Sequence, residues 1–212
     1  MYYYLYIIYV IIMVYFIFYY LTKTHKNFKK RKLDNSYYIR TIINLLVSVC
    51  LLIFIIINYT FSTDLIPKLQ NIIFWFITTD AVYYWIHRTI HKNPSLKEFF
   101  HFKHHEAIKL VPFDIFYTDY KENILYLFII YIVPLLFIQL NIIEYLIIII
   151  ISFYHSYYTH SDIKNKFIIP LFIHSKHHKK HHTIGGGGNY SVFFNIWDEY
   201  MGSKLKKTRL IK

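Results

Sequence analysis

Long apolar runs constrain this chain more than any other feature of its sequence. Residues 2–21 carry no charged side chain, and further apolar runs cover residues 42–61, 72–86 and 124–154. A helix needs about 20 consecutive apolar residues to cross a bilayer, and in lipid its backbone hydrogen bonds must be satisfied internally. The run 124–154 is too long for one span and contains Pro134, so it predicts a helical hairpin. We therefore expect an all-α integral membrane bundle of about three spans plus this hairpin.

The composition supports a membrane protein and excludes several other classes. Apolar residues make up 56% of the chain and aromatic residues 21%. The single cysteine, Cys50, excludes a disulfide framework and any site built from several cysteines. The formal charge of +12 favours basic loops against anionic lipid headgroups. We expect no nucleic-acid partner.

The distribution of basic residues predicts the topology. Seven Lys or Arg lie between Lys23 and Arg40, and the positive-inside rule places this segment in the cytosol. Residues 1–70 then form an N-terminal transmembrane hairpin with a basic cytosolic loop. Alternating crossings bring residues 87–122 and 155–212 to the same cytosolic face. These two segments hold every histidine cluster, so we expect a cytosolic, histidine-rich helical cap.

Twelve of the thirteen histidines fall into four groups. Within each group, the histidines follow one another at intervals of one to five residues. Residues three and four apart stack on one face of a helix, so each group can direct its imidazoles together. In the last group, the histidines span an arc of about 140°, with the two intervening lysines on the other side. The groups contain His87 and His91; His101, His104 and His105; His155 and His160; and His174, His177, His178, His181 and His182.

This pattern predicts metal binding. Neutral imidazole is a good ligand for iron, zinc and copper, and the candidates outnumber what one metal takes, so we expect two metals. The zinc-protease motif HExxH is absent, as are a P-loop and the dinucleotide fingerprint GxGxxG. The run from Gly185 to Gly188 reads as a loop.

The arrangement resembles the fatty acid hydroxylase and sterol desaturase superfamily. Its signature of HxxxH, HxxHH, a lone His and a final HxxHH runs here from about Asp80 to Ser203. Within it, the chain is most similar to sterol C4-methyl oxidases. The segments that carry this likeness are DAVYYWIHRTIH, HFKHHEAIKLVPF, HSYY, PLFIHSKHHKKHH, GNYS and WDEYMGS.

The resemblance implies a catalytic domain over residues 71–212 and a non-haem di-iron centre that oxidises a membrane lipid with O2. Electrons would come from NAD(P)H through cytochrome b5 or its reductase, and a purified sample can carry zinc instead of iron. A eukaryotic protein of this kind would lie in the endoplasmic reticulum membrane with a cytosolic active site. The implied metal ligands are His87, His91, His101, His104, His105, His155, His178, His181 and His182, with His177 as a further candidate.

Three other residues and two other functions stay open at this stage. Asp80 lies seven residues before His87, on the same helical face, and we expect it to orient a ligand imidazole; an interfacial structural role is the alternative. His160 and His174 have no counterpart in the family pattern and are candidates for an outer shell or the surface. A sphingoid base or fatty acyl chain is the alternative substrate. A non-catalytic metal-binding membrane protein is the alternative of another class.

Overall fold

The computed structural model describes residues 33–108, 110–161 and 172–205, together with isolated positions between 9 and 28. In this part of the chain all regular elements are helices, and backbone pairing between extended segments is limited to two isolated bridges. The helices are α3 (Asn35–Asn58), α4 (Leu69–Lys92), α5 (Pro94–Leu96), a π-helix (Lys97–His101), α6 (Phe102–His105), a 3-10 helix (Pro112–Phe116), α7 (Tyr120–Tyr131), a 3-10 helix (Val133–Leu136), α8 (Ile142–Thr159), α9 (Ser175–Thr183) and α10 (Ile196–Tyr200).

Helix α3 starts seven residues before the predicted apolar run because Asp34 caps it. The Asp34 carboxylate accepts a hydrogen bond from the backbone N–H of Tyr37 at 2.8 Å, which satisfies a donor that has no partner inside the helix. Further along the buried face, the Asn44 amide donates to the carbonyls of Phe116 and Thr118, both at 2.9 Å. These two bonds fix α3 against the segment that leads into α7.

The predicted hairpin at residues 124–154 is present, but its two helices differ in length. Helix α7 has 12 residues, which corresponds to about 18 Å and is too short to cross a bilayer. A 3-10 helix containing Pro134 follows it, since proline cannot donate the next helical hydrogen bond. Helix α8 then begins with a capping box, in which Asn141 and Glu144 each accept the other's backbone N–H.

Two helices of the described part, α3 and α8, are long and apolar enough to cross a membrane. Most of the expected span at residues 2–21 lies outside the described residues. The predicted number of spans and the side of the membrane that carries the histidines therefore stay predictions.

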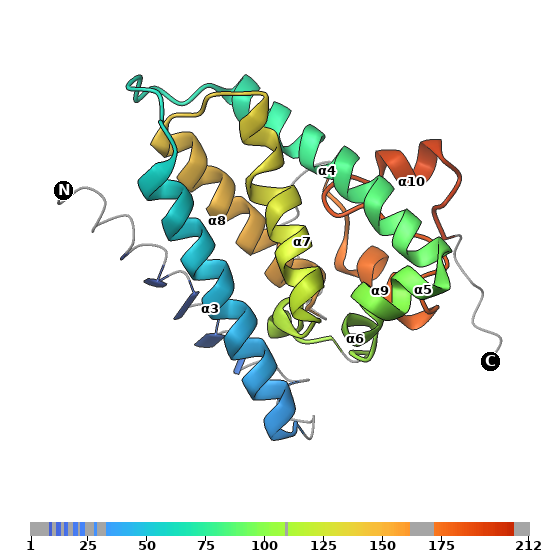
Figure 1. Ribbon diagram of the computed structural model, residues 1–212. Coiled ribbons are helices and arrows are strands. Elements are labelled where there is room, and N and C mark those ends of the chain that lie inside the picture. The colour runs from blue at the N-terminus through green and yellow to red at the C-terminus, as the bar shows by residue number, and fades with distance from the viewer. Residues whose placement is uncertain are drawn as a thin grey trace.

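The arrangement of the helices gathers the histidine-bearing segments. The loop after α3 and the loop before α8 meet at one end, where the Ser62 N–H donates to the Leu140 carbonyl at 2.9 Å. Figure 1 shows α5, α6 and α9 together, away from that end and beside the last turns of α4. The core between the long helices contains Leu52, Trp75, Tyr145 and Ile148, all fully buried.

Candidate metal centre

Five histidines from four elements converge in one cluster, which we call the five-histidine cluster. Helix α4 supplies His87 and His91, the π-helix supplies His101, α6 supplies His105 and α9 supplies His181. Their ligand atoms all lie within 4.8 Å of one another. The His105 Nε2 lies 3.1 Å from the Nε2 atoms of His101 and His181, and 3.2 Å from that of His91.

A second group, the four-histidine cluster, lies directly beside the first. It contains His104 of α6, His160 at the end of α8, and His178 and His182 of α9. The His178 Nε2 is 3.0 Å from the His160 Nε2 and 3.1 Å from the His182 Nε2. The rings of His105 and His182, one from each cluster, stack at 4.7 Å. The two clusters therefore form one continuous centre.

Each HxxHH motif is divided between the two clusters. In HFKHH, the outer pair His101 and His105 joins the five-histidine cluster, and His104 joins the other. In the second motif the division is reversed, because His178 and His182 share the four-histidine cluster with His104. Helices α6 and α9 thus each contribute ligands to both sites, which ties the two sites together.

The hydrogen bonds at the far side of the rings determine which ring nitrogen is free to bind a metal. The Nδ1 atoms of His87, His181 and His160 lie 2.7, 2.8 and 3.1 Å from the carbonyls of Tyr190, Gly188 and Ser156. A carbonyl can only accept, so each Nδ1 carries the proton and donates it. In the neutral ring, the Nε2 atom then presents a lone pair to the cluster. Metal-bound histidines have this arrangement.

The residues present fit two metal ions. Metal–nitrogen bonds of about 2.1 Å place two ligands at right angles about 3.0 Å apart, and neighbouring Nε2 atoms in the five-histidine cluster are separated by 3.0 to 3.2 Å. Lone pairs that face one another at this distance repel unless a cation lies between them. Among the described residues, neither cluster includes a carboxylate or a cysteine, so imidazole alone would hold the metals.

Burial keeps these imidazoles neutral. It lowers the pKa of His101, His104 and His178 well below the ordinary value, and the neighbouring imidazoles lower it further. Burial has the same effect on the pKa of His181 and His182. Neutral imidazole is the form that binds metal.

We expect acid to destabilise the protein and release its metal. A buried histidine with a lowered pKa takes up a proton in the unfolded state first, so the free energy of unfolding falls as the pH drops below about 6.5. Several histidines contribute, so the fall should be steep. Bound metal and the unfolding temperature, measured in detergent from pH 8 to pH 5, should decline together. A flat profile above pH 5 would contradict the buried neutral state.

Two predicted site residues lie outside both clusters. The His155 Nε2 donates to the Val192 carbonyl at 2.7 Å, and its ring packs on Phe172 and Phe193 at 5.0 and 5.2 Å. His160, expected in the outer shell of the site or at the surface, lies in the four-histidine cluster instead of His155. His177 also lies apart, with its Nε2 3.0 Å from the Asp198 carboxylate.

Asp80 has a different contact from the one expected. Its Oδ1 accepts the backbone N–H groups of Val192 and Phe193 at 3.0 and 2.7 Å, and among the described residues no imidazole bonds to it. It therefore positions the segment beside Tyr190, whose carbonyl anchors His87. His174 bonds to the Tyr158 hydroxyl at 3.2 Å and belongs to neither cluster.

Asp198 holds the neighbouring loop in place. It is fully buried and accepts the backbone N–H groups of Tyr190 and Ser191 at 2.9 and 3.0 Å and the Ser203 hydroxyl at 2.8 Å. Burial alone would raise the pKa of Asp198, but hydrogen bonds from His177 and from the two backbone groups lower it to about 2. The carboxylate therefore stays charged and secures the turn that carries the carbonyl bonded to His87.

Glu122 is a functional candidate that sequence reasoning missed. This buried residue of α7 contacts the Nδ1 of His101 with one oxygen and accepts the Thr118 hydroxyl with the other. Burial raises the pKa of Glu122 well above its ordinary value, and a metal ion on His101 would favour the charged carboxylate. Such a carboxylate fixes the ring and raises its basicity as a ligand.

Replacing Glu122 with glutamine should weaken metal binding without unfolding the protein. The amide fills the same volume and can still accept one hydrogen bond, but it lacks the negative charge. We expect the affinity of the five-histidine cluster to fall by about 10- to 100-fold. Competition with a chelator measures it, and Glu98→Gln, on the exposed part of the same region, is the control. An unchanged dissociation constant would leave Glu122 with a packing role alone.

Comparison with known protein families agrees with this geometry. A model of the fatty acid hydroxylase family matches residues 72–203. The chain belongs to the fatty acid hydroxylase family. The match contains all nine clustered histidines and assigns this family member to the oxidoreductases. No curated protein and no solved structure matches the chain.

Proposed function

We propose that this fatty acid hydroxylase family member is a membrane-bound, O2-dependent di-iron enzyme that oxidises an unactivated C–H bond of a lipid. The observation that supports it is the pair of adjacent, all-histidine clusters, whose Nε2 atoms converge within the residues matched by the family. When bound, two irons would supply the oxidising power for this reaction.

The chain's own residues would hold and shield the irons. Nine neutral imidazoles provide the ligands, and the carbonyls of Tyr190, Gly188 and Ser156 keep three of them in the ligating tautomer. The clusters are largely buried, which limits the access of water and so limits side reactions.

The apolar helices and basic segments support a site at a membrane surface. Helices α3 and α8 are candidate spans, and His160 follows the end of α8 directly. We propose an integral membrane protein with a cytosolic centre, in the endoplasmic reticulum if the source is eukaryotic. Its electrons would come from NAD(P)H through cytochrome b5 or its reductase.

For the substrate we propose a sterol, oxidised at a C4-methyl group. The support is the likeness of the histidine boxes and of GNYS and WDEYMGS to sterol C4-methyl oxidases. A sphingoid base or a fatty acyl chain is the alternative within the same reaction class.

Lipid analysis in a sterol-synthesising host that lacks its own C4-methyl oxidase tests this function. The chain should lower the 4,4-dimethyl sterols, and its membranes should contain about two additional irons per chain. His181→Ala should abolish the change while the protein is still made. Bound iron with persistent 4,4-dimethyl sterols would move the substrate to another lipid. Bound metal with no oxidised lipid of any class would favour a metal-binding protein without catalysis.

A further inference from the structure

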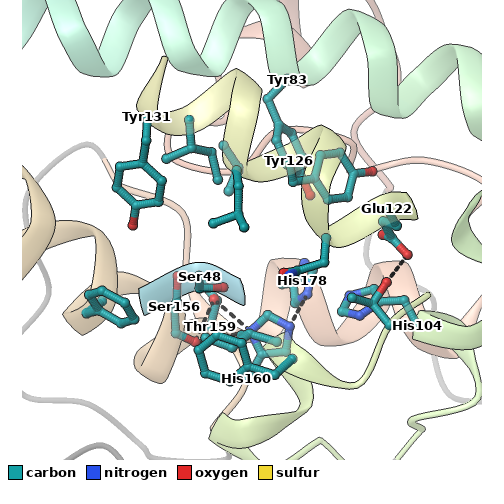
Figure 2. A pocket seen from close by; sticks show the side chains of 18 of the residues that line it. Ser48, Tyr83, His104, Glu122, Tyr126, Tyr131, Ser156, Thr159, His160 and His178 are labelled. Atoms are coloured by element: carbon teal, nitrogen blue, oxygen red, sulfur yellow. Dashed lines mark hydrogen bonds between the residues drawn. The ribbon is translucent and has the colours of Figure 1, made fainter. Parts of the chain in front are cut away.

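A cavity of about 130 Å³ lies between α3, α7 and α8, next to the four-histidine cluster. Three of the four histidines of that cluster, His104, His160 and His178, line it, and no member of the five-histidine cluster does. Figure 2 shows His160, Thr159 and Ser48 on one side of the cavity and Tyr131 and Tyr126 across from them. A molecule in this cavity therefore meets the four-histidine cluster first.

The lining of the cavity is mixed. Apolar side chains such as Ile115, Leu127, Ile130 and Phe153 suit a hydrocarbon. Between them lie hydroxyl groups. The hydroxyl oxygen of Ser191 is buried without a hydrogen-bond partner, and the Tyr126 hydroxyl bonds to that of Tyr83. Ser191 is 2% exposed. A buried hydroxyl without a partner is destabilising, so the Ser191 hydroxyl indicates that a polar group binds in this cavity.

The size of the cavity limits what it can take. Pockets that enclose a whole small molecule have volumes of about 300–1,000 Å³, and this cavity is much smaller. It can accept only one end of a lipid, with the remainder lying along the apolar helices. The end that enters must carry both hydrocarbon and an oxygen atom, because the lining offers partners for both.

We infer that this cavity binds the reacting end of the substrate, an inference that rests on the proposed function. The substrate then carries a hydroxyl or carbonyl oxygen close to the carbon that is oxidised, and Ser191 and Tyr126 bind this oxygen while the carbon faces the four-histidine cluster. This assignment excludes oxidation in the middle of an unsubstituted acyl chain. A 3-hydroxysterol oxidised at its C4-methyl group meets this requirement, and so does a sphingoid base oxidised near its hydroxyl.

Paired lipids test the oxygen requirement. The metal-loaded protein in nanodiscs is given a 4-methyl sterol with a 3-hydroxyl group and the same sterol without it, and likewise a sphingoid base and its 3-deoxy form. We expect the hydroxylated member of one pair to bind and be oxidised at least about tenfold better than its deoxy partner. The pair that shows the difference identifies the lipid class. Equal binding and oxidation within each pair would overturn the inference.

Variants of the lining test the location. Ser191→Ala and Tyr126→Phe remove one hydroxyl each and should reduce the preference for the hydroxylated lipid by about tenfold, with two metals per chain retained. Ile130→Trp should fill the cavity and abolish lipid binding at unchanged metal content. Ile77→Trp, in a separate apolar groove between α4 and α8, is the control and should leave the preference unchanged.

The outcomes separate this inference from the proposed function. If the native protein oxidises no lipid of any class, the proposed function fails and the cavity loses its role with it. If it oxidises only an unsubstituted acyl chain, the proposed function stands and the inference is wrong. If the native protein prefers the hydroxylated lipid but all three lining variants keep that preference, the function stands and the inference is wrong. Water that merely fills the cavity would give this last result.

Discussion

His160→Gln should reduce bound metal from two ions to one per chain, and His155→Gln should leave both ions in place. The His160 Nε2 points into the four-histidine cluster, 3.0 Å from the His178 Nε2. Its Nδ1 donates to the Ser156 carbonyl, a bond that a glutamine amide can replace. The substitution therefore removes an imidazole ligand and little else, and a glutamine oxygen is a poor substitute for imidazole on iron.

The same substitution at His155 is the matched control. His155 is also buried, at 2% exposed compared with 7% for His160, and the glutamine amide can still donate to the Val192 carbonyl that His155 contacts. Metal analysis of both purified variants, with oxidation of the lipid as a second readout, decides the assignment. We expect His160→Gln to be inactive. Loss of a metal from His155→Gln and retention of both metals in His160→Gln would restore the ligand set suggested by the sequence.

Sequence spacing alone could not decide whether His155 or His160 faces the four-histidine cluster. His155 and His160 are five residues apart, and at about 100° per residue their directions on a helix differ by about 140°. Only one of them can face a given site, and the packing of α8 against α9 decides which. The family pattern favours the first, and the three-dimensional arrangement brings the second to His178 and His182.

Other features were predictable because they depend on local periodicity. The i, i+3, i+4 spacing in HFKHH and in HHKKHH places imidazoles on one side of a helix, and eight of the nine predicted ligands lie in the clusters. The division of each motif between two clusters depends on how α6 and α9 face one another. Glu122 follows His101 by 21 residues with no pattern between them, so only the packing of α7 on the π-helix reveals their contact.

The structure also explains why glycine occupies position 186, and replacing this glycine should strongly weaken metal binding. Gly186 has a φ of +80°, and a Cβ atom built there would lie 2.0 Å from the His91 Cε1. No side chain fits unless the His91 ring leaves its position in the five-histidine cluster. We therefore expect Gly186→Ala to displace this ligand, to lower the metal affinity of that cluster by at least about tenfold, and to reduce lipid oxidation by at least as much.

Neighbouring glycines separate the clash from backbone strain. Gly185 also has a positive φ, +69°, but a Cβ there would meet nothing within 4 Å, so Gly185→Ala should cost only the strain, about 1–2 kcal/mol of stability. At Gly187 the nearest atom would be Ile184 Cγ2 at 3.9 Å, an ordinary contact, and Gly187→Ala should bind metal normally.

Chelator competition and thermal unfolding of the three variants distinguish these effects. If Gly186→Ala binds both metals as tightly as Gly187→Ala, His91 does not occupy the position that the structure gives it. If Gly185→Ala loses metal to the same extent as Gly186→Ala, the conformation of the loop, and not the closeness of Gly186 to His91, maintains the five-histidine cluster.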